Sequence, residues 1–70
     1  MNVLDLENER AELKYRLDKL TVFLREQKKE RTISGEQLDL LYFQYMYMCG
    51  YMRTLNQRIK DLDLERDQHD

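Results

Sequence analysis

The residues of this sequence best suited to bind a ligand are tyrosines that stand beside basic residues. Tyr15 lies between Lys14 and Arg16, and Tyr51 comes two residues before Arg53. A tyrosine ring stacks on a nucleobase for about 1–3 kcal/mol, and a neighbouring lysine or arginine holds a phosphate. The candidate ligand-binding residues are therefore Arg10, Lys14, Tyr15, Arg16, Lys19, Tyr47, Tyr51 and Arg53.

The same residues also have a purely structural interpretation. Aromatic side chains at helical spacing commonly belong to a helix–helix core. Lys14 and Arg16 are able to pair with Asp18 or Glu12 across one helical turn, which would use their charge within the chain. The sequence leaves both interpretations open.

Catalytic and metal-binding motifs are missing from the sequence. It holds no glycine-rich phosphate loop and no HExxH, GxSxG or CxxC motif. Cys49 and His69 would supply only two of the roughly four ligands of a structural zinc site. We therefore predict a protein that is not an enzyme and that uses neither a metal nor a cofactor.

Size and composition favour one small helical domain that associates with further copies. The chain has 70 residues, of which 37% are charged, with no proline and two glycines. This composition favours helices. A chain of this length buries only roughly 60% of its unfolded surface. Because the single cysteine cannot form a disulfide within the chain, self-association is the remaining route to stability.

Charge and hydropathy indicate a cytoplasmic protein. The net charge of −2 makes duplex nucleic acid an unsuitable partner. The longest uncharged stretch, residues 40–52, is shorter than the ~18–20 apolar residues that cross a membrane. The N-terminus is acidic and resembles no secretory signal, and a lone cysteine suits a reducing compartment.

The elements that must position these residues are two helices. From Leu13 to Leu24 the leucines follow steps of four, three and four residues, which form one heptad seam. Ser34 and Gln37 form a capping box, which predicts that a second helix starts at Gly35. Apolar residues then recur at every third or fourth position as far as residue 62.

Two long helices joined by a short link fold back as an antiparallel hairpin. Folding the chain at residue 32 places Leu24 near Leu41 and Arg10 near Leu55. The predicted fold class is all-α, a coiled-coil-like two-helix hairpin that assembles into a homo-oligomeric bundle. The single domain covers residues 1–70, with helix 1 at about 3–29, a link at 30–34, helix 2 at about 35–65 and a frayed tail at 66–70.

The uncharged stretch of helix 2 carries more apolar side chains than one neighbouring helix covers. Residues 40–52 hold four of the five tyrosines, three of the four methionines and the cysteine. A helix that is apolar all round is buried on several sides. The predicted oligomer interface is a second row of residues three or four positions apart: Leu40, Phe43, Tyr47 and Gly50. Tyr42, Met46 and Tyr51 fit core, interface or pocket equally well.

Two segments, NERAELKYRLDKLTVFL and LDLLYFQYMYMCGYMRTLNQRI, resemble a family of short phage-encoded proteins first noticed through crAss-like phages. The resemblance covers about residues 8–60. The chain departs from the family pattern at Tyr47, where the family has a small residue, and in the link KKERTISGE, where the family has a phenylalanine. The matching positions are Glu9, Arg10, Glu12, Leu13, Arg16, Leu17, Lys19, Leu20, Phe23, Leu24, Leu40, Leu41, Gln44, Met48, Tyr51, Leu55, Arg58 and Ile59.

The resemblance implies an accessory phage protein in the cytoplasm of the bacterial host. Small helical-hairpin phage proteins of similar architecture oligomerise and sequester the cyclic nucleotides of CBASS or Thoeris defence. By this analogy we expect a counter-defence protein that binds a cyclic nucleotide-type signal between subunits. The alternative is a helical module that binds a host protein, such as a CRISPR effector or the transcription machinery, through its Tyr/Met surface.

Overall fold

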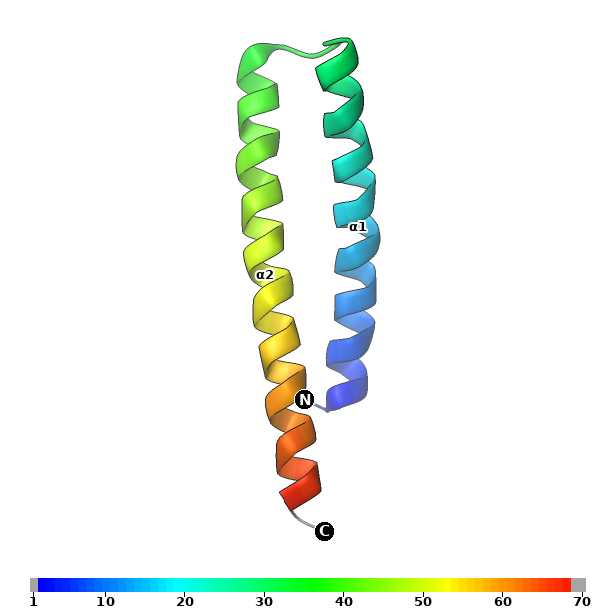
Figure 1. The fold of residues 1–70 in the computed structure, drawn as a ribbon, viewed down its shortest axis with the longest axis vertical. Helices are drawn as coiled ribbons and strands as arrows, with labels where there is room; N and C mark the ends of the chain where they lie inside the picture. Colours follow the sequence, from blue (N-terminus) through cyan, green and yellow to red (C-terminus); the bar gives the residue numbers. More distant parts are fainter. Residues whose placement is uncertain (1, 69–70) are drawn as a thin grey trace.

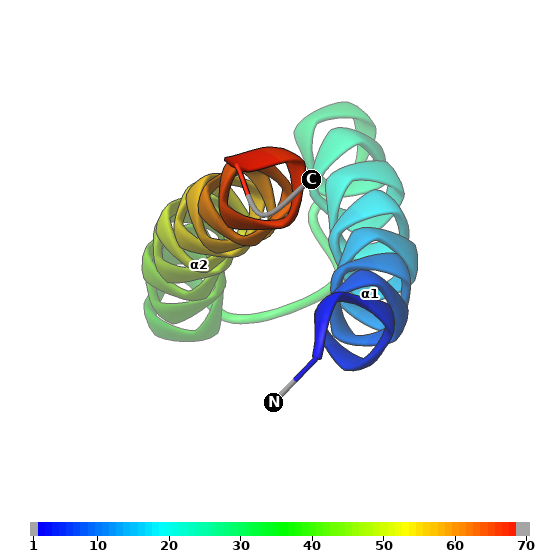
Figure 2. The same cartoon turned by 90° about the horizontal axis from the view of Figure 1, so that it is seen from below.

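The chain folds into two antiparallel helices that lie side by side (Figure 1). The computed structural model describes residues 2–68, and its description of side chains ends at residue 64. Helix α1 spans Val3–Lys29 and helix α2 spans Gly35–Gln68. Seen along the hairpin, the two helix axes cross at an angle (Figure 2). The predicted all-α two-helix hairpin is therefore confirmed.

Local signals fix the start and the end of α1. The side-chain oxygen of Asn2 accepts a hydrogen bond of 2.9 Å from the backbone N–H of Asp5, which caps the N-terminus. Lys28 and Lys29 occupy the last turn, where positive charge interacts favourably with the helix dipole. Both ends of α1 thus follow from residues within or next to it.

A buried glutamine closes the turn between the helices. Gln27, which is only 6% exposed, lies three residues after Leu24 on the apolar seam of α1. Its amide nitrogen donates to Thr32 Oγ1, and its amide oxygen accepts from the Thr32 backbone N–H, both at 2.8 Å. The side chain of Gln27 therefore ties the connection to the end of α1.

Helix α2 begins where the cap predicts and continues further than expected. The Ser34 hydroxyl oxygen accepts a 3.1 Å hydrogen bond from the Gln37 backbone N–H, as an N-cap does. The helical backbone then extends to Gln68, three residues past the predicted end at about residue 65. No glycine or proline follows Gly50 to end the helix. The frayed tail at residues 66–70 stays a prediction, and residues 69–70 lie outside the described residues.

The buried core is concentrated at the end of the hairpin that carries the chain termini. Leu6, Leu13, Leu55 and Ile59 form one buried cluster, with partly buried apolar neighbours from both helices. The molecule measures 55 × 17 × 16 Å, and its radius of gyration is 16.2 Å. A globular chain of this length would have a radius of about 11 Å. A rod of this shape has little interior, so many apolar side chains stay near the surface.

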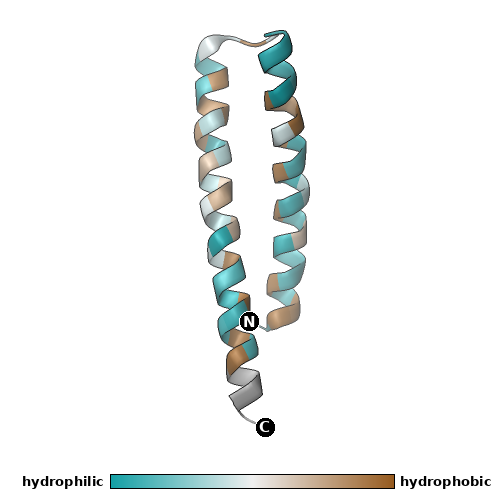
Figure 3. Ribbon diagram, viewed as in Figure 1, coloured by the Kyte–Doolittle hydropathy of each residue, from teal (hydrophilic) through white to brown (hydrophobic). Residues whose placement is uncertain are grey.

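The end that carries the connection is less completely packed. Leu24 is buried there, but Leu17, Leu20, Leu41 and Tyr45 are only half-buried. In Figure 3 the part of α2 nearest the connection is largely pale or brown, whereas teal dominates much of α1. Neither helix, over the described residues, has the length and hydropathy of a membrane span.

Candidate functional site

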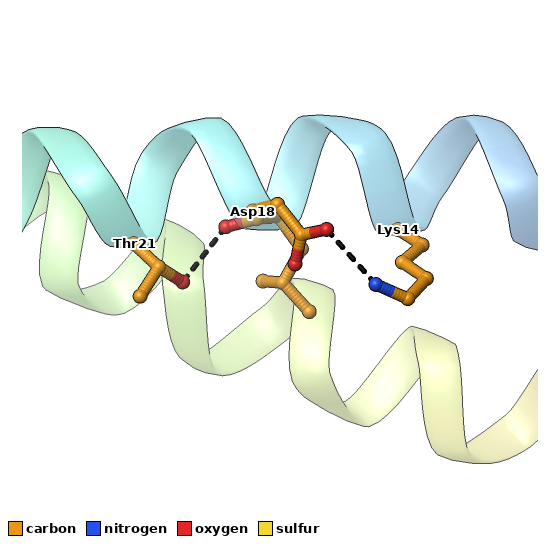
Figure 4. A network of polar contacts seen from close by, with 4 residues as sticks. Lys14, Asp18 and Thr21 are labelled. Carbon is orange, nitrogen blue, oxygen red and sulfur yellow. Dashed lines mark hydrogen bonds and ion pairs between the residues drawn. The ribbon is translucent and has the colours of Figure 1, made fainter.

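A row of polar and charged side chains follows one side of α1, next to α2. Lys14, Asp18, Thr21, Arg25 and Lys28 are separated by steps of four, three, four and three residues. This spacing keeps them on one face of the helix. Figure 4 shows the first three of them on the side of α1 that faces α2. The row forms one wall of the groove between the helices, which has a terminal-end part and a connection-end part.

The terminal-end groove combines both signs of charge. It has a volume of about 590 Å³. The Arg10 guanidinium donates a 3.1 Å hydrogen bond to Asn56 Oδ1 across the helices, which agrees with the predicted placement of Arg10 near Leu55. Lys14 Nζ lies 2.9 Å from Asp18 Oδ2, so its charge is used within the chain. The groove is lined by Glu7, Arg10, Ala11, Lys14, Leu17, Asp18, Met52 and Asn56.

The connection-end groove is smaller, and the charged residues among its described lining, Arg25 and Lys28, are both positive. Its volume is about 240 Å³. Neither Arg25 nor Lys28 forms an ion pair with any side chain described in residues 2–64. Tyr42 and Tyr45 form the opposite wall on α2, and both are half-buried. The lining residues are Thr21, Leu24, Arg25, Lys28, Tyr42 and Tyr45.

Sequence patterns alone do not single out this group of residues. Arg25 and Lys28 look like ordinary solvated helix residues when they are considered alone. The signal that was available is their spacing from Leu24 combined with the hairpin register, which places Leu24 near Leu41 and therefore near Tyr42 and Tyr45. Only the fold shows that the cations and rings face one groove.

The predicted ligand-binding residues lie on several faces of the hairpin. Arg10 and Lys14 line the terminal-end groove, and Arg53 lines a neighbouring hollow on α2. Lys19 Nζ lies 4.4 Å from the centre of the exposed Tyr15 ring, a cation–π contact. The remaining predicted residues, Arg16, Tyr47 and Tyr51, are exposed. One chain does not bring this set together, so a single site that includes all of them requires further copies.

The predicted oligomer-interface row remains uncovered in the single chain. We call Leu40, Phe43, Tyr47 and Gly50 the outer stripe. Leu40 and Phe43 are exposed, and Tyr47 is 74% exposed. A hollow of about 470 Å³ over this face is lined by Leu40, Phe43, Gln44 and Tyr47, without any residue of α1.

No packing contact within the chain explains why position 50 is a glycine. Apart from its chain neighbours and the nearby backbone of its own helix, a Cβ atom added at Gly50 would meet no described atom within 4 Å, and the Gly50 backbone φ is not positive. Glycine inside a helix costs about 1 kcal/mol relative to alanine. The space beside Gly50 therefore lies open to a molecule outside the chain.

The described residues form no cluster typical of a metal site. No group of three or more His, Cys, Asp or Glu side chains in the described part of the chain could hold a metal ion. Cys49 is half-buried, and His69 lies outside the described residues. The described side chains support stacking, hydrogen bonding and charge pairing.

Comparison with known protein families finds one match. The family model described as Sequestin matches residues 3–61, which is most of the chain and includes both walls of the groove. No curated protein and no solved structure matches the chain.

Proposed function

The chain belongs to the Sequestin family, and we propose that it is a phage counter-defence protein that sequesters a cyclic nucleotide-type immune signal. It binds the signal in the cytoplasm of the bacterial host and leaves it chemically unchanged. The family name denotes sequestration, which agrees with binding and not with catalysis. The observation that carries the proposal is the set of exposed tyrosine rings and basic side chains along a hairpin whose outer stripe is uncovered.

Aromatic rings and cations on the same rod are the chemistry that a nucleotide needs. The tyrosine rings stack on bases, and the guanidinium and ammonium groups hold phosphates. In this proposal Tyr15, Tyr47 and Tyr51 offer rings from exposed positions. The cations that complete the predicted pocket are Arg10, Lys14, Arg16, Lys19 and Arg53.

The pocket forms between subunits in this proposal, because one hairpin presents these groups on different faces. The outer stripe supplies the contact to another copy: it is apolar, uncovered and includes the open position Gly50. Close backbone approach at a glycine is a common way for helices to meet. Oligomerisation would thus complete both the core and the ligand site.

The test is a binding experiment that also follows the fate of the ligand. Purified protein is titrated with cyclic dinucleotides, cyclic trinucleotides and cyclic ADP-ribose isomers. A ligand at 100 times its Kd should stabilise the fold by about 2.7 kcal/mol. After heat denaturation the bound ligand should be recovered intact. The absence of any thermal shift across the panel, or chemical conversion of the ligand, would contradict the proposal.

The alternative function is a helical module that inhibits or adapts a host protein. The exposure of Phe43, Met46 and Tyr47 favours it, because aromatic and methionine side chains are enriched in interface cores. Light scattering separates the two functions: a stable homo-oligomer covers the outer stripe, whereas a monomer leaves it free. A monomer that captures one defined host protein would favour the alternative.

A further inference from the structure

We propose that the connection-end groove is a nucleoside-phosphate subsite that is built within one chain. Arg25 and Lys28 hold the phosphate, and Tyr42 and Tyr45 face the base or sugar. The inference rests on the proposed function for the class of ligand, but it places the contact on residues different from the predicted set. It also needs no second copy to form the subsite.

The charge distribution favours this groove over the terminal-end groove. Lys14 is paired with Asp18, and Glu7 adds a second carboxylate to the same terminal-end groove. Among the described residues, none of those that line the connection-end groove is acidic. An incoming phosphate would therefore find two unneutralised cations at one end and partly neutralised cations at the other.

The two cations suit a phosphate in complementary ways. The arginine guanidinium donates two parallel hydrogen bonds to phosphate oxygens, whereas the lysine ammonium acts as a point charge. Arg25 and Lys28 are three residues apart on one face of α1, so both are able to reach the same anion. Lys28 also interacts with the C-terminal dipole of α1. That role does not explain Arg25, which lies one turn earlier.

The hydrogen bonds within the groove limit which side chains are able to donate to a phosphate. The Thr21 hydroxyl donates to the Leu17 carbonyl oxygen at 2.8 Å (Figure 4), so its hydrogen is already used. Donors to a phosphate must therefore come from the cations and from the tyrosine hydroxyls. Tyr42 and Tyr45 are half-buried and three residues apart on α2, which directs both toward one wall of the groove.

The size of the groove limits what one chain encloses. Pockets that bury drug-sized ligands have volumes of about 300–1,000 Å³. At about 240 Å³ the connection-end groove is smaller. It suits one phosphate with its adjoining sugar or base, so a larger cyclic ligand would extend beyond it.

The experiment measures ligand affinity by calorimetry for the 70-residue parent protein and three double variants. The probes are ADP and the panel of cyclic nucleotides. Arg25→Gln/Lys28→Gln removes the proposed phosphate contacts. Lys29→Gln/Arg31→Gln, at exposed positions of the same end, changes the net charge equally. Lys14→Gln/Arg16→Gln tests the ligand-binding residues that were predicted from the sequence. Circular dichroism verifies that each variant is helical.

The inference predicts that Arg25→Gln/Lys28→Gln lowers affinity at least about 30-fold, because two charge-assisted hydrogen bonds are lost. The Lys29→Gln/Arg31→Gln control should stay within about threefold of the parent, since it loses only diffuse surface charge. Equal losses in both variants would overturn the inference, because they would indicate a general charge effect.

Two further outcomes separate the inference from the proposed function. If the cyclic nucleotides bind and only Lys14→Gln/Arg16→Gln weakens them, the inference is overturned and the proposed function stands. If ADP binds through Arg25 and Lys28 but no cyclic nucleotide binds, the proposed function fails and the inference stands. Binding of no probe by the parent protein overturns both.

Discussion

The two ends of the hairpin follow the same heptad spacing but are packed differently. At the terminal end, Leu6 and Leu55 are fully buried, and the carboxylates that line the groove partly neutralise its cations. At the connection end, Leu20 and Tyr45 are half-buried, and the cations of the groove pair with no side chain described in residues 2–64. The difference shows that a regular heptad spacing does not by itself bury the seam residues along the whole length of the hairpin.

The cause lies in which side chains occupy the seam of α2. Leucine and isoleucine fill the seam at the terminal end and carry no polar atom that needs water. Tyr45 occupies the seam near the connection, and its hydroxyl needs a hydrogen-bond partner or water. The connection end therefore stays open along one side, which leaves a surface for a ligand or another copy.

The largest effect should come from the terminal end. Leu55→Ala removes a fully buried leucine and should lower the free energy of unfolding by about 3 kcal/mol, within the range for large-to-small core changes. Leu20→Ala, at a half-buried seam position, should cost about half as much because fewer contacts are lost. Urea unfolding monitored by circular dichroism at low protein concentration measures both. Equal losses would remove the distinction between the two ends.

The next effect concerns the turn that closes the connection end. Gln27→Ala deletes both hydrogen bonds to Thr32 and leaves polar groups of the connection without their partner. Stability should fall by about 2 kcal/mol. Gln57→Ala, at an exposed position of α2, is the matched control and should change stability by less than about 0.5 kcal/mol. A Gln27 variant as stable as this control would show that the turn does not depend on the buried amide.

Gly50→Ala tests whether another copy covers the outer stripe. In dilute monomeric protein the substitution should stabilise α2 by about 1 kcal/mol, because alanine is the better helix former and the added Cβ meets nothing. At higher concentration it should weaken self-association, measured by sedimentation or light scattering. Unchanged association would show that no partner backbone approaches Gly50.

The smallest effect is expected at the exposed ion pair of the terminal-end groove. Lys14 and Asp18 have side chains 69% and 65% exposed, respectively. Asp18→Asn should change stability by less than about 0.5 kcal/mol, as is usual for a solvated pair one turn apart. Thermal unfolding at low and high salt measures it. A loss above 1 kcal/mol would mean that this groove contributes to folding.

Local rules account for what could be predicted from the sequence. The seam predicted the two-helix hairpin, and the Ser34 cap placed the start of α2. The role of Gln27 was not predicted, although its seam position three residues after Leu24 offered a signal. The sequence contains no comparable signal for the end of α2, because helix formers continue through the last turns.

The candidate site could be predicted only in part, since it depends on which faces of the two helices meet. The sequence predicted Tyr15 as a ligand-binding residue because it is next to a lysine. In the structure this ring contacts Lys19 on an exposed face. Arg25 and Tyr45 are twenty positions apart and meet only because the hairpin brings them to one groove. Contacts between copies depend on geometry that one chain does not contain.

The most direct test of the account is an amide chemical-shift titration of the protein with the cyclic nucleotide panel. We predict that a binding ligand shifts amides near Thr21, Arg25, Lys28, Tyr42 and Tyr45, at the connection end, and leaves the packed core around Leu55 unchanged. Shifts confined to the terminal end, or no shifts with any member of the panel, would contradict the claim that the connection end binds the ligand.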